Sequence, residues 1–201
     1  MKIIVGTNNQ GKLTEMQDSI QSDQVRLISY TEYTKQRLDF AETGKTFREN
    51  AVEKAEKFCH SLNQPVLADD GGLVLAAFPQ LLGIKTARFF KTGLSDQEKN
   101  QQLFDLMKDQ TNRKVTLFAT LAYANPKGST LVVEKSLSGE LTIEEIGTEG
   151  YGFDRIFFIP SIGKTLAQLP LEERNRYSAR TRALRELTNQ IVLEANGNEK
   201  D

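Results

Sequence analysis

The sequence of 201 residues contains one cysteine, Cys59, and one histidine, His60. A single cysteine excludes an internal disulfide and a cysteine-built zinc site, and a single histidine excludes a multi-histidine metal site. Cys59 falls on an apolar helical stripe, which favours a packing role over a nucleophile. Because soft ligands are so scarce, any metal bound here is expected to be hard and oxygen-bound, so magnesium or manganese.

Long apolar runs and an excess of charge are also missing. No run reaches the length of a membrane span, and the N-terminus lacks the apolar core of a signal peptide, so we expect a cytoplasmic protein. Lys and Arg number 26 against 27 Asp and Glu, a net charge of −1. That balance gives no reason to expect nucleic acid or a membrane as partner. An anion site would need a local arrangement of basic groups.

Two adjacent aspartates, Asp69 and Asp70, follow a short buried strand predicted to end at residue 68. Gly71 and Gly72 come next, and glycine is common where the backbone turns sharply or approaches a ligand closely. Neighbouring carboxylates repel each other unless a positive group lies beside them, so a divalent metal or a basic side chain is expected. Asp-Asp-Gly-Gly is also an ordinary turn sequence, and taken alone it favours a turn.

The first twenty residues predict a strand, a polar loop and a helix. Residues 3–5 are apolar, residues 6–12 are small and polar, and apolar residues then recur at helical spacing. Such a loop points free backbone N–H groups at an anion. A bound phosphate would offset the unfavourable position of Lys12 in the first helical turn, whereas the alternative is an ordinary turn with a solvated lysine. The loop is not a P-loop, because Leu13 stands where a hydroxyl residue is required.

Further strands and helices alternate along the chain, which indicates the α/β class. Capping boxes at Thr46 and Ser95 begin two helices, and Lys54 lies four residues after Asn50 on the first of them. The alternative for Lys54 is an ion pair with surface glutamates. Residues 30–45 are predicted to be irregular, and residues 196–201 a frayed tail. The remaining predicted elements are strands at 25–29, 115–124, 131–137 and 156–159, and a long helix near the C-terminus.

Six motifs in order and spacing resemble one family, the inosine triphosphate pyrophosphatases. The resemblance covers nearly the whole chain, from Met1 to about Leu187, and six motifs in register are far more specific than any one of them. They are Thr7, Asn9 and Lys12; Glu42 to Ala51; Ala68 to Leu73; Thr86 to Phe89; Gly150 to Phe157; and Ser161 to Leu169.

The resemblance implies an elongated α/β fold: a mixed β-sheet with flanking helices, and two lobes around a central nucleotide-binding cleft. It implies one pyrophosphatase domain over residues 1–195, followed by the tail at 196–201, and a homodimer. It also implies hydrolysis of ITP, dITP and XTP to the monophosphate and pyrophosphate, with Mg²⁺ as cofactor and Mn²⁺ as a substitute. Such an enzyme removes non-standard purine nucleotides from the nucleotide pool.

The motifs carry residue roles with them. Phosphates would be held by Thr7, Asn9, Lys12 and Lys54, with Gly71 in the phosphate region. Glu42 and Asp70 would hold the metal, and Asp70, with Asp69 beside it, would activate water. On the base side the resemblance points to Phe153 for stacking, to Asp154 beside it, to Arg174 where the family usually has a lysine, and to Ser178 and Arg180 around the base-recognition turn.

The sequence departs from the family pattern at several positions. Gly71 replaces a serine, and Ala179 replaces the histidine of the base-recognition turn. Two alternatives therefore stand beside the main interpretation: a pyrophosphatase with shifted base specificity, and a nucleotide-binding protein without catalysis. The presence of Glu42, Asp69 and Asp70 argues against the second alternative, because a pure binder needs no group that activates water.

Overall fold

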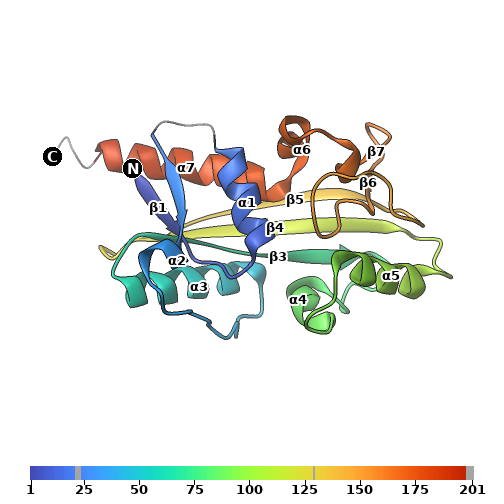
Figure 1. The fold of residues 1–201 in the computed structure, drawn as a ribbon, viewed down its shortest axis with the longest axis horizontal. Helices are drawn as coiled ribbons and strands as arrows, with labels where there is room; N and C mark the ends of the chain where they lie inside the picture. Colours follow the sequence, from blue (N-terminus) through green and yellow to red (C-terminus); the bar gives the residue numbers. More distant parts are fainter. Residues whose placement is uncertain (21–23, 129, 198–201) are drawn as a thin grey trace. The chain divides into compact units, whose positions relative to one another are not determined.

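The computed structural model describes residues 1–20, 24–128 and 130–197 (Figure 1). The chain divides into two compact units. The first comprises Met1–Asp70, Ala119–Lys135 and Arg180–Asp201, and the second Gly71–Phe118 and Ser136–Ala179. Two of the boundaries between the units fall directly after Asp70 and directly after Ala179. Asp70 and Arg180 therefore belong to the first unit, whereas Gly71 and Ser178 belong to the second.

The described strands form a mixed seven-stranded sheet in the order β2-β1-β3-β4-β5-β6-β7, which confirms the predicted α/β class. β1 pairs in parallel with both β2 and β3, whereas β6 pairs antiparallel with both β5 and β7. The strands are β1 (Lys2–Val5), β2 (Arg26–Ser29), β3 (Val66–Leu75), β4 (Lys114–Ala124), β5 (Thr130–Leu141), β6 (Phe157–Ile159) and β7 (Lys164–Thr165).

The strand that carries the two aspartates is longer than predicted. β3 continues through Asp69 and Asp70 to Leu75. The predicted strand end at residue 68 and the predicted turn at Asp-Asp-Gly-Gly are therefore wrong. Pairing with neighbouring strands outweighs the local preference for a turn. The lack of a side chain at Gly72 instead allows the backbone at Gly83 to approach the strand closely, because a Cβ on Gly72 would lie 2.4 Å from the carbonyl oxygen of Gly83.

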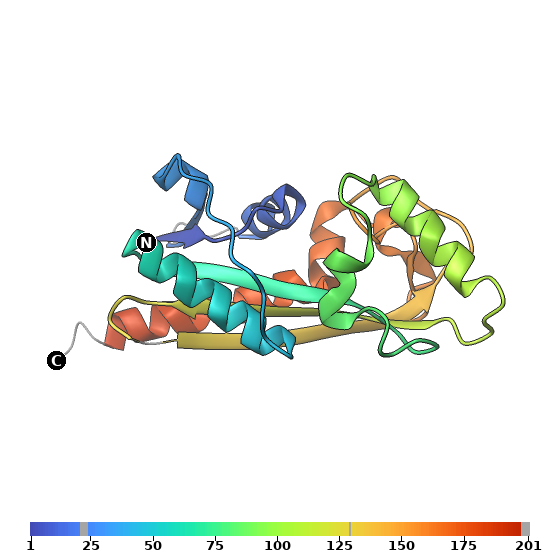
Figure 2. The same ribbon diagram turned by 90° about the horizontal axis from the view of Figure 1, so that it is seen from below.

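The first unit contains the helices α1 (Gln10–Ser19), α2 (Tyr30–Tyr33) and α3 (Phe47–Leu62), and α7 (Ala179–Gly197) from its second residue. Figures 1 and 2 show α3 and α7 on opposite sides of the strands between them. α3 packs its small residues and Phe58 against β1, β3 and β4. The segment predicted to be irregular contains α2, and α7 extends into the predicted tail; residues 198–201 lie outside the described residues.

The second unit has its own apolar core, built around α5 (Asp96–Met107), β6 and the adjoining parts of β3, β4 and β5. Its shorter elements are η1 (Gly83–Lys85), α4 (Thr86–Phe89), η2 (Leu166–Gln168) and α6 (Leu171–Tyr177). The predicted capping box is confirmed at Ser95, where Glu98 completes it. Of the helices in the described ranges, none is long and apolar enough to cross a membrane.

Candidate active site

The loop between β1 and α1 is organised by its own side chains. Asn9 is the N-cap of α1, and its Oδ1 accepts a hydrogen bond from the backbone N–H of Lys12 at 3.0 Å. The backbone N–H of Asn9 in turn donates to Oγ1 of Thr7 at 3.1 Å. These contacts confirm the predicted strand, loop and helix, and they place Lys12 in the first helical turn.

Lys12 is not a solvated lysine, because it pairs with the first aspartate of β3. Its Nζ lies 2.6 Å from Oδ1 of Asp69, and Nε of Arg180 donates to Oδ2 of the same carboxylate at 2.9 Å. Burial opposes ionisation of Asp69, but the charges of Arg180 and Lys12 outweigh it and hold the pKa of Asp69 well below its usual range. Asp69 is therefore a buried anion with two cationic partners.

Glu15 is a member of this cluster that the sequence reasoning missed. Its Oε2 accepts a hydrogen bond from Nη1 of Arg180 at 2.6 Å, so Arg180 spans two carboxylates. Glu15 lies one helical turn after Lys12, which is the sequence signal that could have marked it. Arg180, expected beside the base-recognition turn, lies among the predicted phosphate residues of the first unit.

Lys54 reaches from α3 to the segment before that helix. Its Nζ lies 2.5 Å from Oε1 of Glu42 and donates to the backbone carbonyl of Asp69 at 3.2 Å. Burial would lower the pKa of Lys54, but the hydrogen bond and charge of Glu42, with the two aspartates, raise it. Lys54 is therefore a firmly charged cation beside a predicted metal ligand, in an ion pair whose members are both largely screened from solvent.

Asn50, one turn before Lys54 on α3, joins the same segment to the second aspartate. Its Nδ2 donates to Oδ2 of Asp70 at 3.0 Å, and its Oδ1 accepts a hydrogen bond from the backbone N–H of Gly44 at 2.8 Å. Burial, together with the negative charge of Glu42, raises the pKa of Asp70, although Lys54 opposes the shift. The two adjacent aspartates thus have pKa values pushed in opposite directions.

The donor set around Asp70 fits a hard divalent cation. Glu42 and Asp70 supply carboxylate oxygens, the ligands that Mg²⁺ and Mn²⁺ prefer. Glu42 is close enough to raise the pKa of Asp70 by its charge, and a divalent cation between two such carboxylates would relieve that repulsion. Within the part of the chain that the structure describes, no group of three or more His, Cys, Asp or Glu side chains is placed to hold a metal ion. Water and substrate oxygens would complete the ligand shell of a cation held by Glu42 and Asp70.

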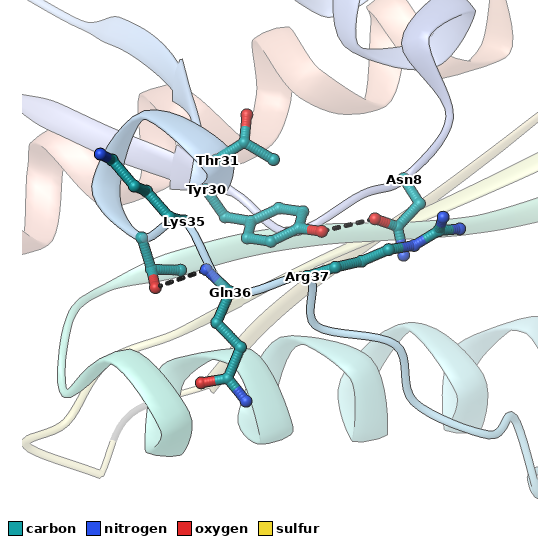
Figure 3. A pocket seen from close by; sticks show the side chains of 7 residues that line it. Asn8, Tyr30, Thr31, Lys35, Gln36 and Arg37 are labelled. Atoms are coloured by element: carbon teal, nitrogen blue, oxygen red, sulfur yellow. Dashed lines mark hydrogen bonds between the residues drawn. The ribbon is translucent and has the colours of Figure 1, made fainter.

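Asn8 ties the loop between β1 and α1 to the chain that follows β2. Its Oδ1 accepts a hydrogen bond from the hydroxyl of Tyr30 at 2.5 Å (Figure 3). Its Nδ2 donates to the backbone carbonyl of Leu38 at 2.9 Å. Tyr30 is buried against Phe58 of α3, with ring centroids 4.9 Å apart. Lys35 and Arg37 line the surface cavity of about 450 Å³ beside Asn8. This cavity adjoins the loop between β1 and α1 without including either aspartate.

The predicted base-side residues Phe153, Asp154, Arg174 and Ser178 all belong to the second unit, as does Gly71. Phe153 packs near Phe90, with ring centroids 6.0 Å apart. Oδ2 of Asp154 accepts a hydrogen bond from the backbone N–H of Tyr151 at 3.1 Å and lies 4.0 Å from Nε of Arg174. The backbone N–H of Ser178 donates to the carbonyl of Arg174 at the end of α6. Phe153, Asp154 and Arg174 are thus gathered around one glycine-rich loop.

With both groups of residues in place, the chain can be compared with known proteins. The sequence model described as the Ham1 family matches residues 3–190. The chain belongs to the Ham1 family. The predicted resemblance is confirmed by relatives named dITP/XTP pyrophosphatase. One from Halalkalibacterium halodurans is 37% identical, covering 92% of this chain and 95% of its own, and one from Staphylococcus epidermidis is 34% identical, covering 91% and 92%.

Solved structures of Ham1 proteins share the fold. The Ham1 protein of Staphylococcus aureus superposes with a TM-score of 0.81 at 32% identity, covering 98% of this chain and 100% of its own. A HAM1 protein from Coxiella burnetii gives a TM-score of 0.83 at 31% identity, covering 96% and 98%. The mixed α/β sheet described above is therefore the Ham1 fold along almost the whole chain.

Proposed function

We propose that this Ham1 protein hydrolyses ITP, dITP and XTP to the nucleoside monophosphate and pyrophosphate, removing them from the nucleotide pool. The observation that carries the proposal is the pair of adjacent aspartates on β3 with opposite electrostatic environments. Relatives named dITP/XTP pyrophosphatase, matched over more than 90% of the chain, support the choice of substrate.

The first unit supplies the groups that anhydride cleavage needs. Lys12 and Lys54 are cations for the triphosphate, and Thr7 and Asn9 offer hydrogen bonds to its oxygens. Cleavage of a phosphoanhydride depends mostly on positioning and on neutralising charge, which these groups provide. Asp70, with its raised pKa, is a stronger base than an ordinary aspartate and is suited to accept a proton from water.

In the proposed reaction, water attacks the α-phosphorus and Asp70 accepts the proton that the water loses. A water oxygen forms a bond to the α-phosphorus, the bond from that phosphorus to the bridging oxygen breaks, and pyrophosphate leaves. The proton lost by the water goes to the carboxylate of Asp70, while Asp69 stays ionised between Lys12 and Arg180. Mg²⁺, or Mn²⁺ in its place, held by Glu42 and Asp70, would polarise the phosphate oxygens when bound.

The second unit is the proposed source of base recognition. Phe153 would stack on the purine, with Asp154, Arg174 and Ser178 around it and Gly71 near the phosphates. Arg180 is the proposed donor to the 6-oxo group that distinguishes inosine and xanthosine from adenosine, because a guanidinium has five N–H groups and can serve a carbonyl oxygen while it keeps its two carboxylate partners. We also propose, from the family resemblance, that the protein is a cytoplasmic homodimer. Light scattering would measure the mass of the particle in solution and so test the homodimer.

A pyrophosphate-release assay over a nucleotide panel tests the proposed activity. With magnesium, ITP, dITP and XTP should yield the monophosphate and pyrophosphate, ATP should be turned over far more slowly, and EDTA should abolish release. Identifying both products fixes the bond that breaks. Release of orthophosphate would indicate a different phosphatase reaction, and tight nucleotide binding without turnover would indicate the non-catalytic alternative.

A further inference from the structure

The glycine-rich loop that carries Phe153 is held by two side chains of α5. The backbone N–H of Gly152 donates to Oδ2 of Asp96 at 2.6 Å, and Nδ2 of Asn100 donates to the carbonyl of Gly152 at 3.4 Å. Asp96 and Asn100 are four residues apart, so they lie one above the other on the same face of the helix. Both backbone groups of one glycine are therefore bound by neighbouring side chains of α5.

Each of these side chains has a further partner of its own. Asn100 is only 1% exposed, and its Nδ2 also donates to Oε1 of Glu145 at 2.6 Å. Asp96 lies in the first turn of α5, and its Oδ1 pairs with Nζ of Lys99 at 3.2 Å. A buried amide with charged and backbone partners has little freedom to reorient. Gly152 is therefore supported at both of its backbone groups by side chains of α5 that have further partners.

Gly152 is a sensitive point of the loop, because its φ of +61° lies in the left-handed region. Phe153 follows directly, so the orientation of its ring depends on how the Gly152 backbone is held. On the other side, Gly150 has a φ of +78°, and a Cβ there would lie 2.0 Å from Oδ2 of Asp154. Glycine adopts this backbone without strain but loses more conformational freedom on folding than other residues, so outside contacts help to keep the loop in one conformation.

We propose that Asp96 and Asn100 are positioning residues for nucleotide binding: they clamp Gly152 and thereby set the position of Phe153 against the base. Neither residue is assigned a contact with substrate. The inference rests on the proposed role of Phe153, and it adds two residues outside the six family motifs described above. Loss of the clamp should weaken binding of the base portion of the substrate and leave binding of its phosphates unchanged.

The test compares a ligand that has a base with one that has none. Calorimetry with magnesium would give Kd values for inosine monophosphate and for inorganic pyrophosphate, which lacks a base. For Asp96→Ala we expect the inosine monophosphate Kd to rise by about tenfold, the magnitude of one lost charge-assisted hydrogen bond, with the pyrophosphate Kd unchanged. Asp96→Asn keeps an acceptor for the Gly152 N–H and should restore most of the affinity.

A matched control separates the clamp from general weakening of α5. Ser95→Ala removes the N-cap of the same helix, since Oγ of Ser95 accepts from the backbone N–H of Glu98. This substitution should lower the melting temperature as Asp96→Ala does, while both Kd values stay at the wild-type level. Asp96 is partly exposed, so its alanine variant should fold; Asn100→Ala is the second test, with the same expected pattern.

Other outcomes also decide the question. The proposal would be overturned if Asp96→Ala lost affinity equally for inosine monophosphate and pyrophosphate, or lost affinity for neither. It would also be overturned if the wild type did not bind inosine monophosphate. If binding depends on Asp96 but the wild type releases no pyrophosphate from ITP, the clamp stands and the proposed catalytic function fails. The binding measurement therefore distinguishes the failure of one from the failure of the other.

Discussion

Nζ of Lys12 lies 2.6 Å from Oδ1 of Asp69, a carboxylate whose side chain is fully buried. Arg180 takes the other oxygen, so Asp69 is neutralised on both sides. Asp70, the next residue, accepts a hydrogen bond from the neutral amide of Asn50 and has a raised pKa. Two carboxylates whose pKa values are pushed apart are suited to different roles. We infer that Asp69 fixes the two cations and that Asp70 exchanges protons.

Replacing Asp70 by asparagine should nearly abolish turnover while the fold survives. Asparagine keeps the shape of the side chain but cannot accept the proton of the attacking water. We expect kcat with ITP to fall by about 10²–10⁴, the typical worth of a general base, and further if a metal ligand is lost. Thermal unfolding of the variant serves as the check on folding. A variant that keeps more than about a tenth of the wild-type kcat would contradict the role.

Lys12→Ala and Lys54→Ala should both raise KM for the triphosphate, because each removes a cation from the proposed phosphate site. Their effects on stability should differ. Lys12→Ala leaves fully buried Asp69 with one cation fewer, at a cost of about 1–3 kcal/mol in the free energy of unfolding. Lys54→Ala leaves Glu42, which is more exposed than Asp69, so the cost in the free energy of unfolding should be smaller than for Lys12→Ala.

Lys57 on α3 provides the control for these two variants. It pairs with Glu53, four residues earlier, in a more exposed position. Lys57→Ala should leave KM unchanged, and urea unfolding of all three variants would give the stability comparison. If KM is the same in the Lys12 and Lys54 variants as in the wild type, these lysines are structural ion-pair partners only.

The folded protein should lose stability in acid through Asp69. The folded-state pKa of Asp69 lies well below its unfolded value, so its ionised form contributes stability that is fully present above the unfolded pKa and disappears as the pH falls through the folded one. Urea unfolding in EDTA between about pH 6 and pH 2 would measure this, because that range includes the unfolded-state pKa of an aspartate and extends below it. Asp69→Asn should be less stable at about pH 6 and should show a shallower decline with acid. Parallel curves for the two proteins would refute the assignment.

Base selectivity should be looser than, or shifted from, a strict preference for inosine and xanthosine, because Ala179 can neither hydrogen-bond nor stack on a purine. Ala179 is buried, and the adjacent Arg180 is engaged by Glu15 and Asp69. The measurement is kcat/KM for ITP, XTP, GTP and ATP on the wild type and on Ala179→His, which should sharpen selectivity. Wild-type discrimination above about a thousandfold (roughly 4 kcal/mol), unchanged by the histidine, would show the idea to be wrong.

Local sequence determined most of the elements and the family. The capping box at Ser95 and the strand predicted at 115–124 depend on residues a few positions apart, and the structure confirms both. The N-cap at Thr46 is confirmed as well, but Glu49 accepts from the backbone N–H of Lys45 rather than closing a box with the cap. Six motifs in register sufficed for the family, because each motif is a short run whose spacing is written in the chain.

Tertiary structure decided what the local pattern could not. Asp69 and Arg180 are 111 residues apart in sequence, and Glu15 and Arg180 are 165 apart, so no local spacing could pair them. Asp-Asp-Gly-Gly favours a turn locally, yet strand pairing extends β3 straight through it. Which cations neutralise which aspartate depends on how β3, α1 and α7 pack together. For that reason the sequence could name the two aspartates, but only the folded chain could give them different pKa values.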